Sequence, residues 1–134
     1  MATIDSIVGI GVKQATKLRK AGIRTTEALL RRAATRSGRK ELAERTGIAA
    51  AQILQWANRA DLMRIKGVGA EYADLLEAAG VETVKELRRR SPKALTAKIV
   101  QLNERKRLVR RLPTEKMIAA WVEQAKSLDS IIKP

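Results

Sequence analysis

The chain has 134 residues, 45% of them hydrophobic, and its 28 lysines and arginines outnumber its 14 aspartates and glutamates to give a net charge of +14. Cysteine and histidine are both absent, which excludes disulfides, zinc sites built on thiolate or imidazole, cysteine nucleophiles and histidine general bases. The surplus of positive charge indicates a polyanion, an anionic membrane surface or an acidic protein as partner. No apolar run reaches the roughly 20 residues that span a bilayer, and the first residues do not form a secretory signal. We therefore expect a cytoplasmic protein without membrane contact.

The hydrophobic residues are almost entirely aliphatic. There is no Phe, one Tyr and two Trp, whereas Ala and Leu, which have the highest helix propensities, abound. No stretch alternates apolar and polar residues for long enough to predict a strand. The sequence therefore predicts an all-α fold of about nine or ten short helices.

The first predicted helix is short, ends before Gly9, and turns back at once into a helix that starts near Val12. Two glycines separated by one aliphatic residue, Gly9-Ile10-Gly11, permit this sharp turn, and an Ala follows four residues later. Amides at a helix start are unpaired and lie at the positive end of the helix dipole, so a phosphate oxygen fits there without any contact to a base. Ala15 lets the two helices pack closely, and Ile10 should enter the core.

A basic stretch and a second helix pair follow. Ala43, Gly47 and Ile53 have the spacing of a helix-turn-helix, in which Gln52, Gln55 and Arg59 would face a major groove. Plain packing of two helices is the more common meaning of this spacing. Trp56 in this segment, like Trp121 near the end of the chain, is predicted to anchor the core.

The chain then repeats itself at an offset of 58. Ile7–Leu30 and Ile65–Arg88 are identical at nine of 24 positions, mostly glycines and apolar residues, and Gly67-Val68-Gly69 with Ala73 reproduces the first turn. The segments around Trp56 and Trp121 match at an offset of 65, so the second half holds about seven extra residues. We expect two related halves, 1–60 and 61–134, which share one core and form a single compact unit.

Several residues mark predicted helix ends. Gly22, Gly47 and Gly80 each precede Ile or Val, as glycine C-caps do. Thr83 with Glu86 has the pattern of a capping box, Ser91 followed by Pro92 that of an N-cap and first helical residue, and Thr114 begins the last helix.

At this point a family resemblance is plain. GIGVKQATKLRKAGIRTTEALL and GVGAEYADLLEAAGVETVKEL resemble helix-hairpin-helix motifs, including the A-G-h-x-T element that follows many of them. The paired copies resemble the SAM-like double helix-hairpin-helix domains of DNA repair, recombination and ligation proteins. Over about residues 2–128 the chain is also similar to an uncharacterised bacterial family, domain of unknown function 4332. The resemblance implies sequence-independent binding across the minor groove with hairpin amides on phosphates. In some relatives hairpin carbonyls also hold a monovalent cation, the one cofactor that the resemblance implies.

The two copies differ in charge where the phosphate would lie. Copy one has Lys13 two residues after its second glycine and Lys17 one turn later, whereas copy two has Glu71 at the Lys13 position and only Lys66 as a nearby cation. We interpret copy one as the working hairpin and copy two as mainly architectural.

Three basic clusters accompany the hairpins, and three together favour phosphate contacts over merely solvated helix faces. They comprise Arg31, Arg32, Arg36, Arg39 and Lys40; Lys85, Arg88, Arg89, Arg90 and Lys93; and Arg105, Lys106, Arg107, Arg110 and Arg111. With the clusters, the predicted nucleic-acid site includes the backbone of Gly9, Gly11, Val12, Gly67 and Gly69 and the side chains of Lys13, Lys17 and Lys66.

The sequence carries no catalytic constellation, no P-loop and no metal-ligating cluster, so we do not expect an enzyme. The prediction is a protein that binds nucleic acid independently of sequence and is nucleoid-associated if that nucleic acid is DNA. Duplex DNA is preferred because the chain lacks aromatic residues for stacking single strands, and structured RNA stays open. The alternative is a non-catalytic protein–protein adaptor in which the hairpins are only structural.

Overall fold

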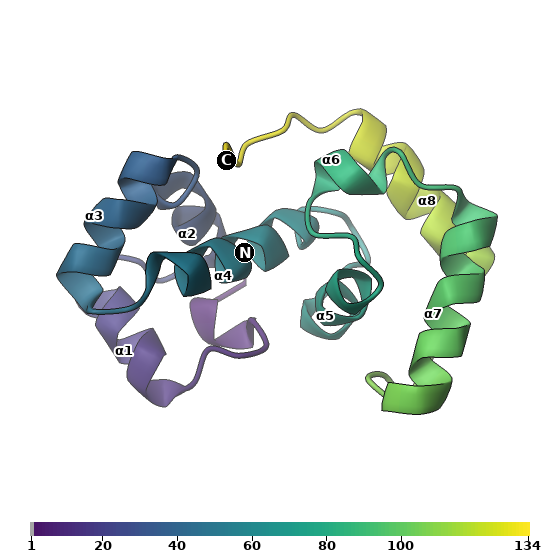
Figure 1. The fold of residues 1–134 in the computed structure, drawn as a ribbon, viewed down its shortest axis with the longest axis horizontal. Helices are drawn as coiled ribbons and strands as arrows, with labels where there is room; N and C mark the ends of the chain where they lie inside the picture. The colour runs from purple at the N-terminus through teal and green to yellow at the C-terminus, as the bar shows by residue number, and fades with distance from the viewer. Residues whose placement is uncertain (1) are drawn as a thin grey trace. The chain divides into compact units, whose positions relative to one another are not determined.

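The computed structural model describes residues 2–134, and these form helices joined by short turns (Figure 1). The described elements are a 3₁₀ helix, η1 (Ile4–Ser6), and the α-helices α1 (Val12–Lys20), α2 (Thr26–Arg32), α3 (Arg36–Thr46), α4 (Ala50–Leu62), α5 (Ala70–Ala78), α6 (Val84–Leu87), α7 (Pro92–Lys106) and α8 (Glu115–Lys126). Within residues 2–134, one isolated bridge between Thr3 and Thr25 is the sole β-type pairing. The predicted all-α class is confirmed. None of the described helices combines the length and apolar character needed to cross a membrane.

The helices divide into two compact units. Unit 1 contains the residues up to Asp61 together with Ile131–Pro134, and unit 2 contains Leu62–Ser130. The last four residues thus belong to unit 1, although the sequence places them in the second half. In unit 1 the Lys133 amide donates a hydrogen bond to the Ala34 carbonyl at 2.7 Å. The Lys133 carbonyl in turn accepts from the Arg39 guanidinium at 2.9 Å.

Each unit buries a set of aliphatic residues around one tryptophan. Trp56 in unit 1 and Trp121 in unit 2 are both only 2% exposed, which confirms their predicted place in the core. The residues that the repeat predicted as buried are also inside: Ile10, Ala15, Val68 and Ala73. The core of unit 2 further gathers residues from α5, α6, α7 and α8, among them Leu76, Leu87, Ile99 and Ile118.

Two glycines end helices in the same way in the two units. After α1, the Gly22 amide donates to the Arg19 carbonyl at 2.9 Å and the Ile23 amide to the Leu18 carbonyl at 2.9 Å. After α5, Gly80 and Val81 make the equivalent bonds to Glu77 and Leu76. This is the Schellman pattern, which requires the positive φ values of +89° at Gly22 and +93° at Gly80. The predicted glycine C-caps are confirmed there, and Gly47, with φ 74°, ends α3.

Side-chain caps start most of the remaining helices. Thr25, Thr35, Ser91 and Thr114 each accept a hydrogen bond from the backbone amide three residues later. The predictions for Ser91-Pro92 and Thr114 are therefore confirmed. The capping box at Thr83 is not: Thr83 precedes α6, but its hydroxyl donates to the Glu86 carboxylate instead of accepting from the helix backbone. A carboxylate is a stronger acceptor than the hydroxyl, so the two side chains pair with each other.

Because the Thr114 hydroxyl accepts from the Met117 amide at 3.1 Å, we expect Thr114→Ala to lower the free energy of unfolding by about 1 kcal/mol. Urea denaturation followed by circular dichroism measures the change. Thr114→Ser keeps the acceptor oxygen and serves as the control. Equal losses in the two variants would contradict a capping role for the hydroxyl.

Candidate functional site

Two turns with the same backbone precede α1 and α5. We call Ile7–Gly11 the first glycine turn and Ile65–Gly69 the second. In the first, Ile7 donates to the Ile4 carbonyl and Ile10 to the Ile7 carbonyl, both at 3.2 Å. In the second, Ile65 donates to Leu62 and Val68 to Ile65, both at 3.1 Å. The leading glycines have φ values of +100° at Gly9 and +95° at Gly67, which side-chain-bearing residues rarely adopt. The repeat in the sequence is therefore also a repeat in conformation.

The second glycine of each turn leaves the start of the following helix open. Gly11 and Gly69 are the N-cap residues of α1 and α5, both extended and without a side chain that could cap the first amides. A Cβ atom placed on Gly69 would have no neighbour within 4 Å, and one on Gly11 would meet only Gln14 Oε1 at 3.1 Å. Uncapped amides at an exposed helix start can donate to an anion.

A tryptophan lies against the first glycine of each turn. A Cβ atom on Gly9 would be 3.5 Å from Trp56 Nε1 on α4, and one on Gly67 would be 3.1 Å from Trp121 Nε1 on α8. The positive φ favours glycine at both positions, and at Gly67 the indole also leaves little room for a Cβ atom, whereas 3.5 Å at Gly9 is an ordinary contact.

The side chain three positions after each tryptophan donates a hydrogen bond to the equivalent backbone carbonyl of its turn. In unit 1 the Arg59 Nη1 donates to the Val8 carbonyl. In unit 2 the Gln124 Oε1 accepts from the Lys66 amide at 3.0 Å, and its Nε2 donates to the Lys66 carbonyl at 3.3 Å. Val8 and Lys66 are equivalent in the repeat. Sequence reasoning missed these two side chains, although the offset of 65 that pairs Trp56 with Trp121 also pairs Arg59 with Gln124.

A monovalent cation, which the resemblance implies for some relatives, does not fit the first glycine turn. A guanidinium group already lies at this turn and donates to one of its carbonyls, and its positive charge repels a second cation. Nor do three or more acidic side chains of the described residues come together to hold a metal.

The two turns present different side chains to solvent. Around the first, Lys13 and Lys17 are exposed, and so are Val8 at 40% and Val12 at 86%. Around the second, Glu71 and Lys66 are exposed. The first glycine turn therefore combines uncapped amides with lysines and apolar surface, and the second lacks the lysine on its helix.

One acid near the first glycine turn is already paired. The hydrogen bond from the Thr3 hydroxyl lowers the pKa of Asp5, and Arg19, 3.5 Å away, lowers it further. Asp5 is therefore ionised at neutral pH and neutralises Arg19. The exposed cations Lys13 and Lys17 lie elsewhere on α1.

The predicted basic clusters contain both exposed and structural residues. Within the three clusters the exposed residues are Arg31, Arg36, Lys40, Lys85, Arg89, Lys93, Arg105, Lys106, Arg107, Arg110 and Arg111. Arg32 instead donates to the Ala21 carbonyl at 3.3 Å and its repeat equivalent Arg90 to the Gly80 carbonyl at 3.2 Å, so both stabilise the end of a preceding helix. Arg88 donates to the Leu128 carbonyl at 3.1 Å.

Arg39 departs most from its predicted role as a phosphate ligand. It is 5% exposed, and its guanidinium donates to the carbonyls of Ala33 and Lys133. Burial lowers the pKa of Arg39, and the neighbouring Arg36 lowers it further. A buried cation must find fixed acceptors, so Arg39 joins parts of unit 1 and does not belong to an exposed basic surface.

The helix pair α3 and α4 does not offer the predicted groove-reading side chains. The turn at Gly47 and the buried Ile53 agree with packed helices. However, Arg59 is nearly buried at the first glycine turn, and the Gln52 amide donates to Gln55 Oε1 at 2.9 Å. Burial of Arg59 and Ile53 therefore favours plain packing of the two helices, the more common meaning of this spacing.

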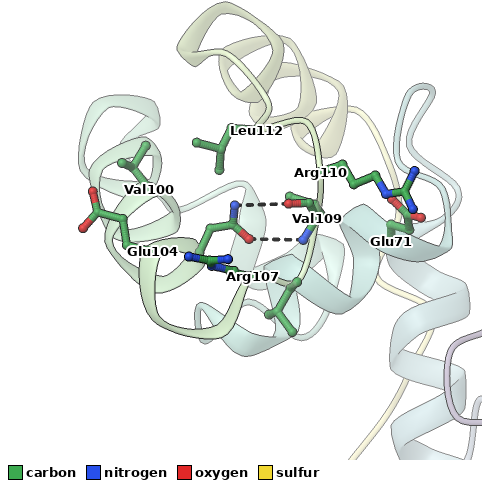
Figure 2. Close-up of a pocket in the computed structure, with 9 residues that line it drawn as sticks. Glu71, Val100, Glu104, Arg107, Val109, Arg110 and Leu112 are labelled. Atoms are coloured by element: carbon green, nitrogen blue, oxygen red, sulfur yellow. Dashed lines mark hydrogen bonds between the residues drawn. The ribbon is translucent and has the colours of Figure 1, made fainter.

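Unit 2 also contains an open pocket of about 590 Å³ between α5, α7 and the segment that follows α7 (Figure 2). It is lined by Glu71, Val100, Asn103, Glu104, Arg107, Leu108, Val109, Arg110 and Leu112. The pocket lining thus combines two carboxylates, two guanidinium groups and several aliphatic side chains.

A family model described as a domain of unknown function, DUF4332, matches residues 8–128. The match covers the glycines of both turns and most of the chain, so the chain belongs to this family. No curated protein matches the chain, and no solved structure does.

Proposed function

We propose that this member of the DUF4332 family binds the backbone of duplex DNA without regard to sequence, and that its two glycine turns are helix-hairpin-helix motifs. The first glycine turn carries the proposal. Its uncapped helix start is exposed and is accompanied by two exposed lysines. In this arrangement the amides from Gly11 onward donate to phosphate oxygens, and Lys13 and Lys17 add charge.

The chemistry of the turn favours the backbone over the bases. Glycine has no side chain with which to distinguish base edges. The only two tryptophans are buried at 2% exposure, so they do not form a stacking platform for single strands. The exposed arginines of the basic clusters supply further phosphate contacts, which set orientation and affinity.

The test is fluorescence anisotropy of a short duplex across a salt series, with wild type compared with Gly11→Val/Lys13→Glu. Gly11 has a φ of −84°, which valine adopts without strain. We expect the variant to lose at least tenfold in affinity, and the log–log salt slope to fall by about 0.9 for each lost phosphate contact. Gly69→Val/Lys66→Glu makes the same change in charge at the second glycine turn and should lose much less.

The two double variants separate a specific site from general attraction to a charge of +14. Equal losses would mean that the first glycine turn is structural and that DNA affinity comes from net charge. Circular dichroism of both variants is the control that shows whether they are folded. If wild type itself does not bind the duplex at low salt, the proposal fails.

One observation favours a second candidate, a protein–protein adaptor. Val8 and Val12 are the large hydrophobic residues that the described chain exposes; Val8 lies in the first glycine turn and Val12 directly follows it. Exposed apolar residues gathered at one place are typical of protein interfaces. For an adaptor, the anisotropy salt slope is shallow, and Val8→Ser/Val12→Ser abolishes partner binding. A DNA-binding protein keeps its steep slope in that variant.

A further inference from the structure

Unit 2 has a basic segment that has no counterpart in unit 1. The segment Arg105–Arg111, which we call the arginine loop, begins with the last two residues of α7 and continues toward α8. It lies in the stretch by which the second half exceeds the first. Its basic side chains are all exposed: Arg105, Lys106, Arg107, Arg110 and Arg111. Glu104 is the single acid between residues 104 and 111.

The arginine loop is held in one conformation by side chains of unit 2. The Asn103 side chain donates to the Val109 carbonyl at 3.2 Å and accepts from the Val109 amide at 3.1 Å. Figure 2 draws these two bonds as dashed lines, which span the loop. The Val109 side chain is buried. Both backbone hydrogen-bonding groups of Val109 are therefore satisfied by one asparagine. Of its two neighbours, Leu108 packs against the core of unit 2 and Arg110 is exposed.

A second tie connects the arginine loop with the second glycine turn. The Tyr72 hydroxyl on α5 donates to the Arg111 carbonyl at 3.0 Å. The Tyr72 ring packs on Trp121 with 5.3 Å between ring centroids, and Trp121 lies against Gly67. Arg107 ends α7 in the left-handed conformation, with φ 47°, and its amide donates to the Asn103 carbonyl. A long arginine side chain loses less entropy on binding when its backbone is already fixed.

From this placement we propose that the arginine loop is the phosphate-binding surface of unit 2, in place of its glycine turn. The inference rests on the proposed function and assigns a different part of the fold to each unit. At the second glycine turn Glu71 stands where Lys13 stands in the first, and a carboxylate there repels phosphate. The loop supplies the missing positive charge a short distance along the same unit.

The charges that line the adjoining pocket favour phosphate contact with the loop residues that lie outside the pocket. Glu71 and Glu104 line that pocket together with Arg107 and Arg110. The two carboxylates offset the two guanidinium groups, so the pocket lining has no surplus of positive charge to attract an anion. Arg105, Lys106 and Arg111 do not line the pocket, and all three are exposed.

The test measures anisotropy of the same duplex with Arg110→Ala/Arg111→Ala, in which the backbone carbonyl that Tyr72 uses is kept. We expect the salt slope to fall by about 2 and affinity to fall accordingly. Lys98→Ala/Lys116→Ala is the matched control, because it removes two exposed cations from the same unit that belong neither to the loop nor to any of the three basic clusters. This control variant should lower the log–log salt slope of DNA binding by well under 1.

A third variant tests whether the fixed conformation matters. Asn103→Ala removes both side-chain bonds to Val109 and leaves the net charge unchanged. Weaker binding at unchanged charge is the expected result. If the arginine pair and the lysine pair lose affinity equally while Gly11→Val/Lys13→Glu still loses most, the arginine loop is not a binding surface but the proposed function stands. If wild type does not bind DNA, both fail together.

Discussion

Replacing Trp56 by alanine is expected to lower the free energy of unfolding by about 3–5 kcal/mol, because it empties a large volume in the core of unit 1. The indole ring is 2% exposed and lies against Gly9, so its removal also withdraws the surface on which the first glycine turn rests. A loss of this size is a large share of the stability of a small protein, which is typically about 5–15 kcal/mol. Urea denaturation followed by circular dichroism measures it.

Phenylalanine at position 56 is the informative control. Within residues 2–134, Trp56 Nε1 is buried without a hydrogen-bond partner. Trp56→Phe therefore removes a donor that contributes no hydrogen bond and keeps most of the apolar volume, and we expect a loss of less than about 2 kcal/mol. If phenylalanine costs as much as alanine, the indole N–H makes an essential bond and our interpretation of the packing is wrong.

The second large effect is expected at Gly67. Gly67→Ala should lower the free energy of unfolding by about 2 kcal/mol or more, because alanine is strained at a φ of +95°. Its Cβ would also stand 3.1 Å from Trp121 Nε1, a contact tight enough to displace the indole. Thermal and urea unfolding of the variant measure the change.

Gly69, two residues later in the same turn, provides the comparison. It has a φ of −91°, and a Cβ atom there would have no neighbour within 4 Å. Reduced freedom of the unfolded chain then offsets the weaker N-cap, so Gly69→Ala should change stability by less than about 0.5 kcal/mol. A Gly69→Ala loss as large as that of Gly67→Ala would show that the turn has a different conformation.

The local features of the fold could be predicted from the sequence because each depends on a few adjacent residues. Gly22, Gly47 and Gly80 end helices as expected, and Ser91 and Thr114 begin them. Each of these caps is decided by the backbone preference or the hydrogen-bonding group of one residue. Thr83 is the exception, since its hydroxyl has two suitable partners and the sequence does not rank them.

The roles of individual arginines could not be predicted, because they depend on residues far away in the sequence. Arg39 and Arg36 lie in the same cluster, yet Arg39 is buried and donates a hydrogen bond to the carbonyl of Lys133, 94 residues later. Arg59 resembles an exposed helical residue but reaches the turn 51 residues earlier. A basic side chain can contribute to a binding site only when the fold does not already engage it in hydrogen bonds to backbone carbonyls.

The return of Ile131–Pro134 to unit 1 has a consequence for the order in which the molecule is completed during synthesis. A ribosome produces all of unit 2 before it produces the Lys133 carbonyl that Arg39 uses. Unit 2, which is continuous in sequence, can therefore close first, whereas the Arg39 guanidinium in unit 1 lacks one of its two carbonyl acceptors until Ile131–Pro134 is made. For the same reason, a fragment cut after Asp61 lacks a part of its own unit, and a fragment of residues 62–130 does not.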